Sequence, residues 1–299
     1  MEFSLLTCAF MASSFVHLPH RTIVSLRGPD TIALLERLVT NSTSDWAIGE
    51  TRYGALLTPQ GKVIADFLAM RSDEGVWLDV SKDHAADLAK RLKMFRLRSQ
   101  VEIDVHDELF VFADLDAAQN HRSELPGAAH VYHDCRYEGG RLRVASTRSD
   151  WAVSSKSITE YHADRIGHVV PEQGTDFGAA AIFPADINMD VLDGVALNKG
   201  CFVGQEVVSR MHRRGKIRKR TLHVELPPEM TAQCGAEIKA PLPIGALTSV
   251  TEGSALAVVR VDRLTSAEQT GDTVTIDETP VTIKKPGWLV AELALMEET

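Results

Sequence analysis

The stretch that decides the interpretation of this chain runs from Lys199 to Gly215 and reads Lys-Gly-Cys-Phe-Val-Gly-Gln-Glu-Val-Val-Ser-Arg-Met-His-Arg-Arg-Gly. Cys201 stands just before a helical pattern that starts near Glu206 and stops at Gly215. The positive end of a helix and the ammonium group of Lys199 both favour thiolate over thiol. We therefore predict an activated thiol at Cys201. A small cysteine buried in the core is the alternative.

This string resembles the signature of the YgfZ family, which comprises folate-binding relatives of the glycine-cleavage aminomethyltransferase that assist iron–sulfur cluster assembly. The glycine-cleavage enzyme itself usually lacks the Lys-Gly-Cys-x-x-Gly-Gln-Glu form, so the YgfZ branch is favoured. The resemblance covers the chain from about residue 20 to a C-terminal barrel. Other segments resemble the family in the same order, namely Leu34–Asn41, Tyr53–Phe67 with its Thr-Pro-x-Gly turn, Phe95–Ile103, Arg165–Glu172, and Phe183 and Pro184 with Asn188.

The resemblance implies an α+β fold, an aminomethyltransferase-like three-part ring of mixed or antiparallel sheets and helices with a C-terminal β-barrel. We place an N-terminal appendage at residues 1–16, because this apolar stretch lacks a charged n-region and Met11 is an alternative start. The first α+β domain is expected at 17–100, the second at 101–219 with the Lys-Gly-Cys motif, and the barrel at 220–299.

The function that the resemblance implies is that of a tetrahydrofolate-binding accessory factor in assembling or repairing 4Fe–4S proteins through Cys201. In this hypothesis Lys199 sets the charge of the thiol, and Gly200 and Gly204 shape the turn. The expected partners are a folate and the assembly or client proteins. Three further motif residues have expected contacts: Gln205 and Glu206 anchor the loop or bind ligand, and Arg210 holds a carboxylate.

The predicted folate contacts lie in three places along the chain. Asp66 matches the position where the aminomethyltransferases carry an aspartate near the reactive folate nitrogen, although an ordinary polar strand residue is an equal alternative. Arg165 belongs to a segment similar to one lining the pterin side of the pocket, but Gly167 replaces an acidic residue found in relatives. Arg213 and Arg214 are expected near the glutamate tail.

Two alternatives to the accessory-factor hypothesis stay open. A folate-dependent aminomethyl or other one-carbon transferase would use Asp66, while the Lys-Gly-Cys motif argues against it because such a transfer needs no thiol. An interaction module with a vestigial folate pocket is the other. Whether the protein is an enzyme is left undecided.

Composition limits the remaining classes. The 299 residues are 44% hydrophobic and 24% charged, which suits a large core and two or three domains. The net charge of −9 argues against a nucleic-acid partner. No apolar run approaches the ~20 residues that span a bilayer, so we predict no membrane partner. The basic run Arg210–Arg220 is an anion site or a solvated face.

Cysteine and histidine spacing predicts no intrinsic metal site. Cys8, Cys135, Cys201 and Cys234 form no Cys-x-x-Cys pair, and no His-Glu-x-x-His spacing occurs. A reducing compartment fits this usage, which predicts the cytoplasm, or the mitochondrial matrix if the source is eukaryotic.

Hydrophobic periodicity predicts alternating strands and helices. We expect helices at Thr31–Val39, at Ser81–Leu97 with Leu88, Leu92 and Phe95 inward, at Asp114–Leu125 and at Ser157–Ile166 closed by Gly167. Strands are expected at Thr22–Arg27, Tyr53–Leu57, Lys62–Met70, Val76–Val80, Leu109–Ala113, Arg141–Ser146 and Trp151–Val153. Barrel strands are expected at Leu222–Leu226, Ile244–Val250, Ala255–Val261 and Trp288–Leu293.

Overall fold

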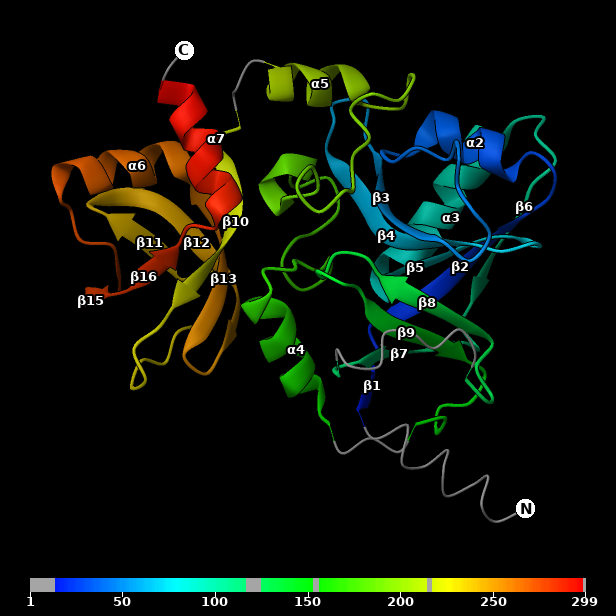
Figure 1. Cartoon of the computed structure of the whole chain (residues 1–299), viewed down its shortest axis with the longest axis horizontal. Coiled ribbons are helices and arrows are strands. Elements are labelled where there is room, and N and C mark those ends of the chain that lie inside the picture. The colour runs from blue at the N-terminus through cyan, green and yellow to red at the C-terminus, as the bar shows by residue number, and fades with distance from the viewer. Residues whose placement is uncertain (1–13, 117–124, 153–155, 214–216, 298–299) are drawn as a thin grey trace.

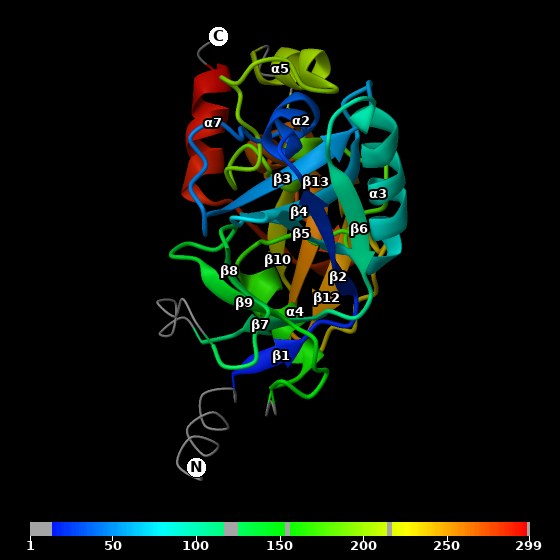
Figure 2. The same ribbon diagram turned by 90° about the vertical axis from the view of Figure 1, so that its right-hand side faces the viewer.

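The computed structural model describes residues 14–116, 125–152, 156–213 and 217–297, which form three antiparallel sheets with helices packed on them (Figure 1). The first two sheets and their helices lie together, and the third sheet with its two helices lies beside them. Figure 2, turned by 90°, shows α5 at the end of the molecule opposite to α4. The predicted helix at Asp114–Leu125 falls largely outside the described residues.

The first sheet has five strands in the order β3-β4-β5-β2-β6. Its helices cover one face, where Val24, Leu35, Leu78, Leu88 and Leu92 share one apolar cluster. The bounds are β2 Arg21–Arg27, α2 Thr31–Leu38, β3 Thr51–Leu57, β4 Val63–Arg71, β5 Gly75–Ser81, α3 Lys82–Arg96 and β6 Glu102–His106.

Every predicted element of this first sheet is present, with ends that differ by one or two residues. The inward placement of Phe95 is wrong, because this side chain is 40% exposed. Leu88 and Leu92 follow the i, i+4 spacing of the buried stripe, whereas Phe95 lies in the last turn, one residue before α3 ends.

The second sheet has four strands in the order β1-β7-β9-β8. A capping box between Ser157 and Glu160 starts its helix. Gly167, which was expected to close the helix after Ile166, is its last helical residue. The bounds are β1 Phe15–His17, β7 Phe110–Asp114, β8 His130–Asp134, β9 Arg141–Ser146 and α4 Ile158–Gly167.

The predicted strand at Trp151–Val153 is wrong at its described residues, because Trp151 lies in a bend. Its indole packs edge-on against Phe15 at 5.2 Å and donates a hydrogen bond to the carbonyl of Pro126 at 2.9 Å. The tryptophan therefore covers an apolar cluster with its ring instead of pairing its backbone with a sheet.

The third sheet has the strand order β15-β14-β11-β12-β13-β10-β16. Its core is one apolar cluster that includes Leu222, Ile238, Leu247 and Leu289. The bounds are β10 Lys219–Glu225, β11 Glu237–Ala240, β12 Leu242–Thr251, β13 Ser254–Arg260, α6 Val261–Thr270, β14 Thr275–Ile276, β15 Thr279–Pro280, β16 Thr282–Lys284 and α7 Gly287–Glu297.

The predicted barrel strand at Trp288–Leu293 is wrong, because these residues lie in α7. Pro286 precedes this helix directly, and proline is well suited to the start of a helix. Leucine, alanine and glutamate then follow, which are strong helix formers, and the sequence lacks the strict alternation of a half-buried strand.

The chain passes from the second sheet to the first after β1 and returns to the second after β6. β1 pairs with β7 in the second sheet, while β2, which follows it directly, pairs with β5 and β6 in the first. β6 lies just after the boundary expected at residue 100, yet it is an edge strand of the first sheet. The two sheets share one apolar cluster that also contains Phe202 and Val208 of the motif region.

Candidate functional site

The segment before the Lys-Gly-Cys motif is hydrogen-bonded to the corner that follows α2. Thr40 donates through Oγ1 to the carbonyl of Gly194 at 2.6 Å, and its own carbonyl accepts from the amide of Ala196 at 3.0 Å. Asn41 donates through Nδ2 to the carbonyl of Asp193 at 2.6 Å. These bonds hold segment 193–196, which contains no strand, against the corner that follows α2.

Lys199 is the next attachment, and its side chain is only 1% exposed. Its ammonium donates to the carbonyls of Val39 at 2.9 Å and Asn41 at 2.7 Å, and lies 3.6 Å from the Glu36 carboxylate. Val39 is the C-cap of α2, so the cation occupies the negative end of that helix. Burial lowers the pKa of Lys199, and Glu36 opposes this shift. The lysine thus holds the loop to α2.

Cys201 is exposed, so the alternative of a buried core cysteine is excluded. Phe202, the next residue, is 8% exposed and packs in the apolar cluster shared by the first two sheets. Cys201 therefore lies in a short exposed loop between two residues with buried side chains, Lys199 before it and Phe202 after it. A sulfur presented in this way is accessible to a second molecule while its backbone is held on both sides.

Gly204 and Gly61 bring the motif loop against the turn between β3 and β4. Their φ angles are +82° and +79°, which favour glycine. A Cβ on Gly204 would lie 2.7 Å from the carbonyl oxygen of Thr58, a distance that no side chain tolerates. Gly200 differs, because nothing lies within 4 Å of the place where its Cβ would be.

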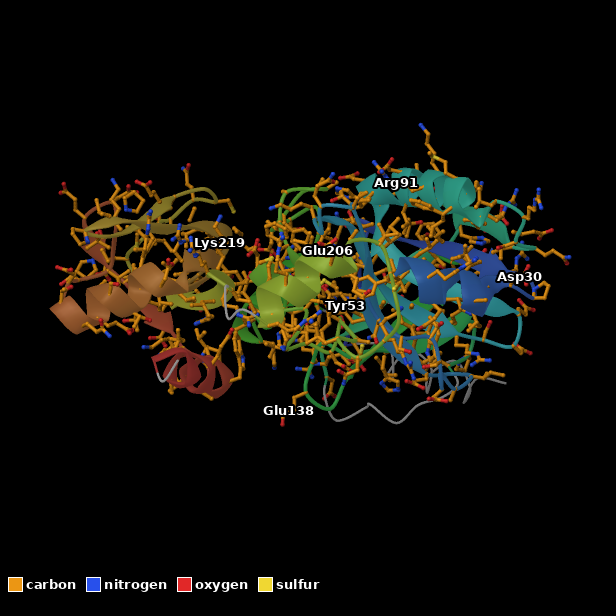
Figure 3. The ribbon with its side chains drawn as sticks, turned by 90° about the horizontal axis from the view of Figure 1, so that it is seen from above. Asp30, Tyr53, Arg91, Glu138, Glu206 and Lys219 are labelled. Carbon is orange, nitrogen blue, oxygen red and sulfur yellow. The ribbon has the colours of Figure 1, made fainter. Side chains whose placement is uncertain are left out.

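The helix that follows, α5 Gln205–Arg213, carries the other motif residues. Gln205 donates through Nε2 to the carbonyl of Lys199 at 3.4 Å, which agrees with its expected anchoring role. Glu206, Arg210 and Arg213 are exposed, and Figure 3 shows Glu206 on the surface of the helix. Within the described ranges Arg210 has no carboxylate partner. Arg214 and Gly215 lie outside those ranges.

Asp66 of β4 is 1% exposed and accepts a hydrogen bond from the Tyr53 hydroxyl through Oδ2 at 2.9 Å. Its other oxygen, Oδ1, is buried and has no hydrogen-bond partner in the described structure. Burial raises the pKa of Asp66, and the positive charges of Arg21 and Arg136 oppose this shift. The carboxyl therefore has one free acceptor position in a buried setting.

A network of buried ion pairs that was not predicted from the sequence lies around Asp66. Asp79 accepts from Arg21 at 2.7 Å and from Arg143 at 2.9 Å, while Arg136 donates to Asp134 at 2.7 Å. Although burial acts to raise the pKa of Asp134, these arginines hold it well below its usual range. Charged residues inside otherwise apolar strands were the available signal.

Glu172 belongs to the same network. Tyr161 donates its hydroxyl to Oε1 at 3.0 Å, and His20 lies 3.0 Å from Oε2. Although burial acts to raise the pKa of Glu172, His20 and Arg21 hold it well below the usual range. The first two sheets are thus joined by buried charges as well as by apolar side chains.

Arg165 is buried, and its guanidinium is used inside the protein. It donates to Asp176 at 2.6 Å, to the hydroxyl of Ser249 at 2.6 Å and to His162 at 2.9 Å. Ser249 belongs to β12, so Arg165 links α4 to the third sheet. Of the folate residues expected from sequence, Asp66 and Arg165 both belong to the charge network at Glu172, which lies 3.8 Å from Arg165. Arg213 instead belongs to α5, which lies well apart from α4 in both side views.

Within the part of the chain that the structure describes, no group of three or more histidine, cysteine, aspartate or glutamate side chains is placed to hold a metal ion. Within the same ranges, none of the helices combines the length and apolar character needed to cross a membrane.

Two family models match this chain. The model described as the GCVT N-terminal domain matches residues 15–113, and that described as the CAF17 C-terminal beta-barrel domain matches residues 218–291. Among solved structures, aminomethyltransferase T of the glycine cleavage system from Bartonella henselae superposes with a TM-score of 0.65 at 16% identity, covering 86% of this chain and 82% of that one. The predicted α+β fold with a C-terminal barrel is therefore confirmed.

Curated relatives carry the name iron–sulfur cluster assembly factor IBA57, mitochondrial, or its homolog. The protein from Mycosarcoma maydis is 32% identical over 225 residues, which are 68% of this chain and 54% of the relative. The human protein is 29% identical over 231 residues, or 68% of this chain and 64% of the relative. The chain thus spans just over half of the first and under two thirds of the second. It has the aminomethyltransferase fold, with a GCVT N-terminal domain and a CAF17-type barrel, and is related in sequence to proteins named as iron–sulfur cluster assembly factors.

Proposed function

We propose that this protein is an accessory factor in the assembly or repair of iron–sulfur proteins, in particular 4Fe–4S proteins, of the YgfZ type. The observation that carries the proposal is the exposed Cys201, held between the buried side chains of Lys199 and Phe202. A thiol with a fixed backbone at the start of a helix suits transient contact with a soft metal or a partner thiol. The names of the sequence relatives support the same role.

A tetrahydrofolate is part of this proposal. The free, buried Oδ1 of Asp66 fits a ligand that offers an N–H donor, whereas Arg165 does not fit, because its nitrogens bond to protein groups. A bound tetrahydrofolate would supply a carrier for one-carbon units. Asp66 would orient it by accepting a hydrogen bond, with Tyr53 holding the other carboxyl oxygen. Arg213 and Arg214 would bind its glutamate tail.

The alternative is a folate-dependent aminomethyl or one-carbon transferase, and the state of Asp66 is the observation that favours it. A buried carboxylate with a free oxygen can stabilise positive charge that develops on a nearby nitrogen. That role would need Asp66 and would not need Cys201.

Complementation separates the two functions. In a strain lacking the protein, we expect Cys201→Ala to leave aconitase-type activity low and Asp66→Asn to restore most of it. The matched control is Cys234→Ala, which removes an exposed thiol from the third domain. Full rescue by Cys201→Ala would refute the accessory-factor proposal, and failure of Asp66→Asn alone would support the transferase.

Folate binding has its own test. Calorimetric titration with tetrahydrofolate is expected to give heat that falls in the Arg213→Ala/Arg214→Ala variant, because the glutamate tail loses charge-assisted hydrogen bonds. Absence of heat with the unmodified protein would remove folate from the proposal and leave the role of Cys201 standing.

The compartment and partners remain predictions. The relatives are named as mitochondrial proteins. We expect this chain to act in the mitochondrial matrix if its source is eukaryotic and in the cytoplasm otherwise, with assembly factors or client proteins as its partners.

A further inference from the structure

Exposed apolar side chains gather where α3 ends. Three of the eight large hydrophobic side chains that are exposed in the described structure lie here, with exposed fractions of 67% for Met94, 40% for Phe95 and 86% for Leu97. Single exposed apolar residues are common, whereas a contiguous group marks an interaction surface. This group therefore indicates a surface that a partner covers.

The backbone conformation of Leu97 also indicates an interaction surface. Leu97 is the C-cap of α3 and has φ +49° and ψ −109°, a conformation that a bulky L-residue adopts only with strain of about 1–3 kcal/mol. Glycine is the residue that helices usually place there. Because the side chain is 86% exposed, packing within this molecule does not explain the leucine. Strain of this kind is typical of positions that contact a ligand or partner.

The same end of α3 is strongly basic in a chain whose net charge is −9. The sequence from Leu88 to Val101 contains no aspartate or glutamate. Arg37 of α2 adds its charge from the opposite side and donates to the hydroxyl of Ser99 at 3.4 Å. The cations between those limits are Lys90, Arg91, Lys93, Arg96 and Arg98.

Four of these residues, Arg37, Arg96, Leu97 and Arg98, line a hollow between α2 and the end of α3. The hollow is lined by Asp30, Ala33, Arg37 and the segment Arg96–Ser99. Asp30 is engaged there, since its carboxylate accepts a hydrogen bond from the amide of Gln100 at 2.7 Å. Figure 3 shows Asp30 at the end of the molecule away from the third sheet.

We propose that this basic–apolar surface, formed by Arg37, Met94, Arg96, Leu97 and Arg98, docks a partner protein through a segment that carries acidic side chains beside an apolar one. The arginines would pair with the carboxylates, and Met94 and Leu97 would cover the apolar side chain. A concave site suits a protein segment better than the flat face of an anionic bilayer, which leaves a hollow unfilled.

The position of this surface relates it to Cys201. Helix α2 contributes Arg37 to the surface, and Lys199 of the motif donates to the carbonyl of Val39, the C-cap of the same helix. Eight helical residues span only about 12 Å, so a protein docked here would lie close to the point where Lys199 holds the motif loop. The inference goes beyond the proposed function and does not require any chemistry at Cys201.

Fluorescence anisotropy with a short labelled peptide of glutamate and leucine tests the proposal. We expect binding to the whole protein that weakens at least about tenfold in Arg37→Glu/Arg98→Glu. It should stay unchanged in Lys239→Glu/Lys284→Glu, which makes the same charge change on exposed lysines of the third sheet. Equal affinity in all three proteins would overturn the proposal. So would binding to phosphatidylglycerol–phosphatidylcholine vesicles without binding to the peptide, because it would assign the surface to a membrane.

Leu97→Gly tests the same surface with a variant that is expected to fold normally. Glycine removes the exposed side chain and relieves the backbone strain, so we expect a melting temperature at or above that of the unmodified protein together with weaker peptide binding. A loss of stability with unchanged peptide affinity would mean that Leu97 serves the fold alone, contrary to the proposal.

Discussion

Gly204 and Gly61 meet backbone to backbone: a Cβ on Gly204 would lie 3.0 Å from the Cα of Gly61. Both glycines have positive φ angles. One belongs to the loop that carries Cys201 and the other to the turn between β3 and β4, the strand that holds Asp66. The thiol loop and the strand of the candidate folate residue are thus joined through a contact that has no room for a side chain.

Replacing Gly204 with alanine should lower the free energy of unfolding by about 2–4 kcal/mol, the sum of overpacking and backbone strain. Gly200→Ala is the matched control and should change it by less than about 0.5 kcal/mol, because the space around Gly200 is open. Urea unfolding measures both. Similar losses in the two variants would contradict the close contact.

Lys199→Met should destabilise the protein by about 2–3 kcal/mol, since the carbonyls of Val39 and Asn41 lose a charged donor in a buried place. Lys62→Met is the control, because its ammonium donates to the carbonyl of Ala181 from an exposed position. Chemical denaturation should show little change for that control. A stability loss in Lys199→Met no larger than in Lys62→Met would refute the anchoring role.

Cys201 should alkylate with iodoacetamide faster than Cys135 at neutral pH, and faster than Cys234. Cys201 is exposed before the positive end of α5. Cys135 is exposed as a residue, yet burial of its thiol and then the Asp134 charge raise its pKa to about 12. Single-cysteine variants analysed by mass spectrometry give the three rates. Equal rates would argue against activation.

Asp66→Asn should stabilise the protein at neutral pH. Because the folded pKa of Asp66 is raised, the folded state binds the proton more tightly, and stability falls as the pH rises from the usual aspartate value to the folded one. Asparagine does not ionise and avoids this loss. The advantage of the variant in melting temperature should therefore shrink as the pH is lowered through that window, and an advantage independent of pH would contradict the shift.

The sequence predicted the elements whose signals are local. The apolar stripe of Leu88 and Leu92 placed α3, and the stretch from Ser157 to Ile166 with Gly167 after it placed α4 to within one residue at each end. The strand predicted at Trp288 failed because a short apolar run fits a strand and a buried helix equally well. Helix-forming residues after Pro286 were the stronger signal.

The sequence named candidate residues for the site but did not predict their contacts. Cys201 and Asp66 were identified by motif, yet the carbonyls that accept from Lys199 lie about 160 positions earlier in the sequence, just after α2. Arg165 was expected to contact folate, but it bonds to groups inside the protein. The sequence could not predict this for the same reason, since its partner Ser249 comes from a different sheet. Long-range pairing of charges depends on topology, which single residues do not encode.

The exchange of strands between the first two sheets has a consequence for synthesis on the ribosome. β1 leaves the ribosome first, but its partner in β7, Asp114 opposite Phe15, follows roughly 100 residues later, a delay of about 5–20 s at usual elongation rates. β2 likewise waits for β6 before the first sheet is complete. Neither sheet can close early, so the nascent chain carries unpaired strand edges for seconds, and shielding by a chaperone during this interval would protect it from aggregation.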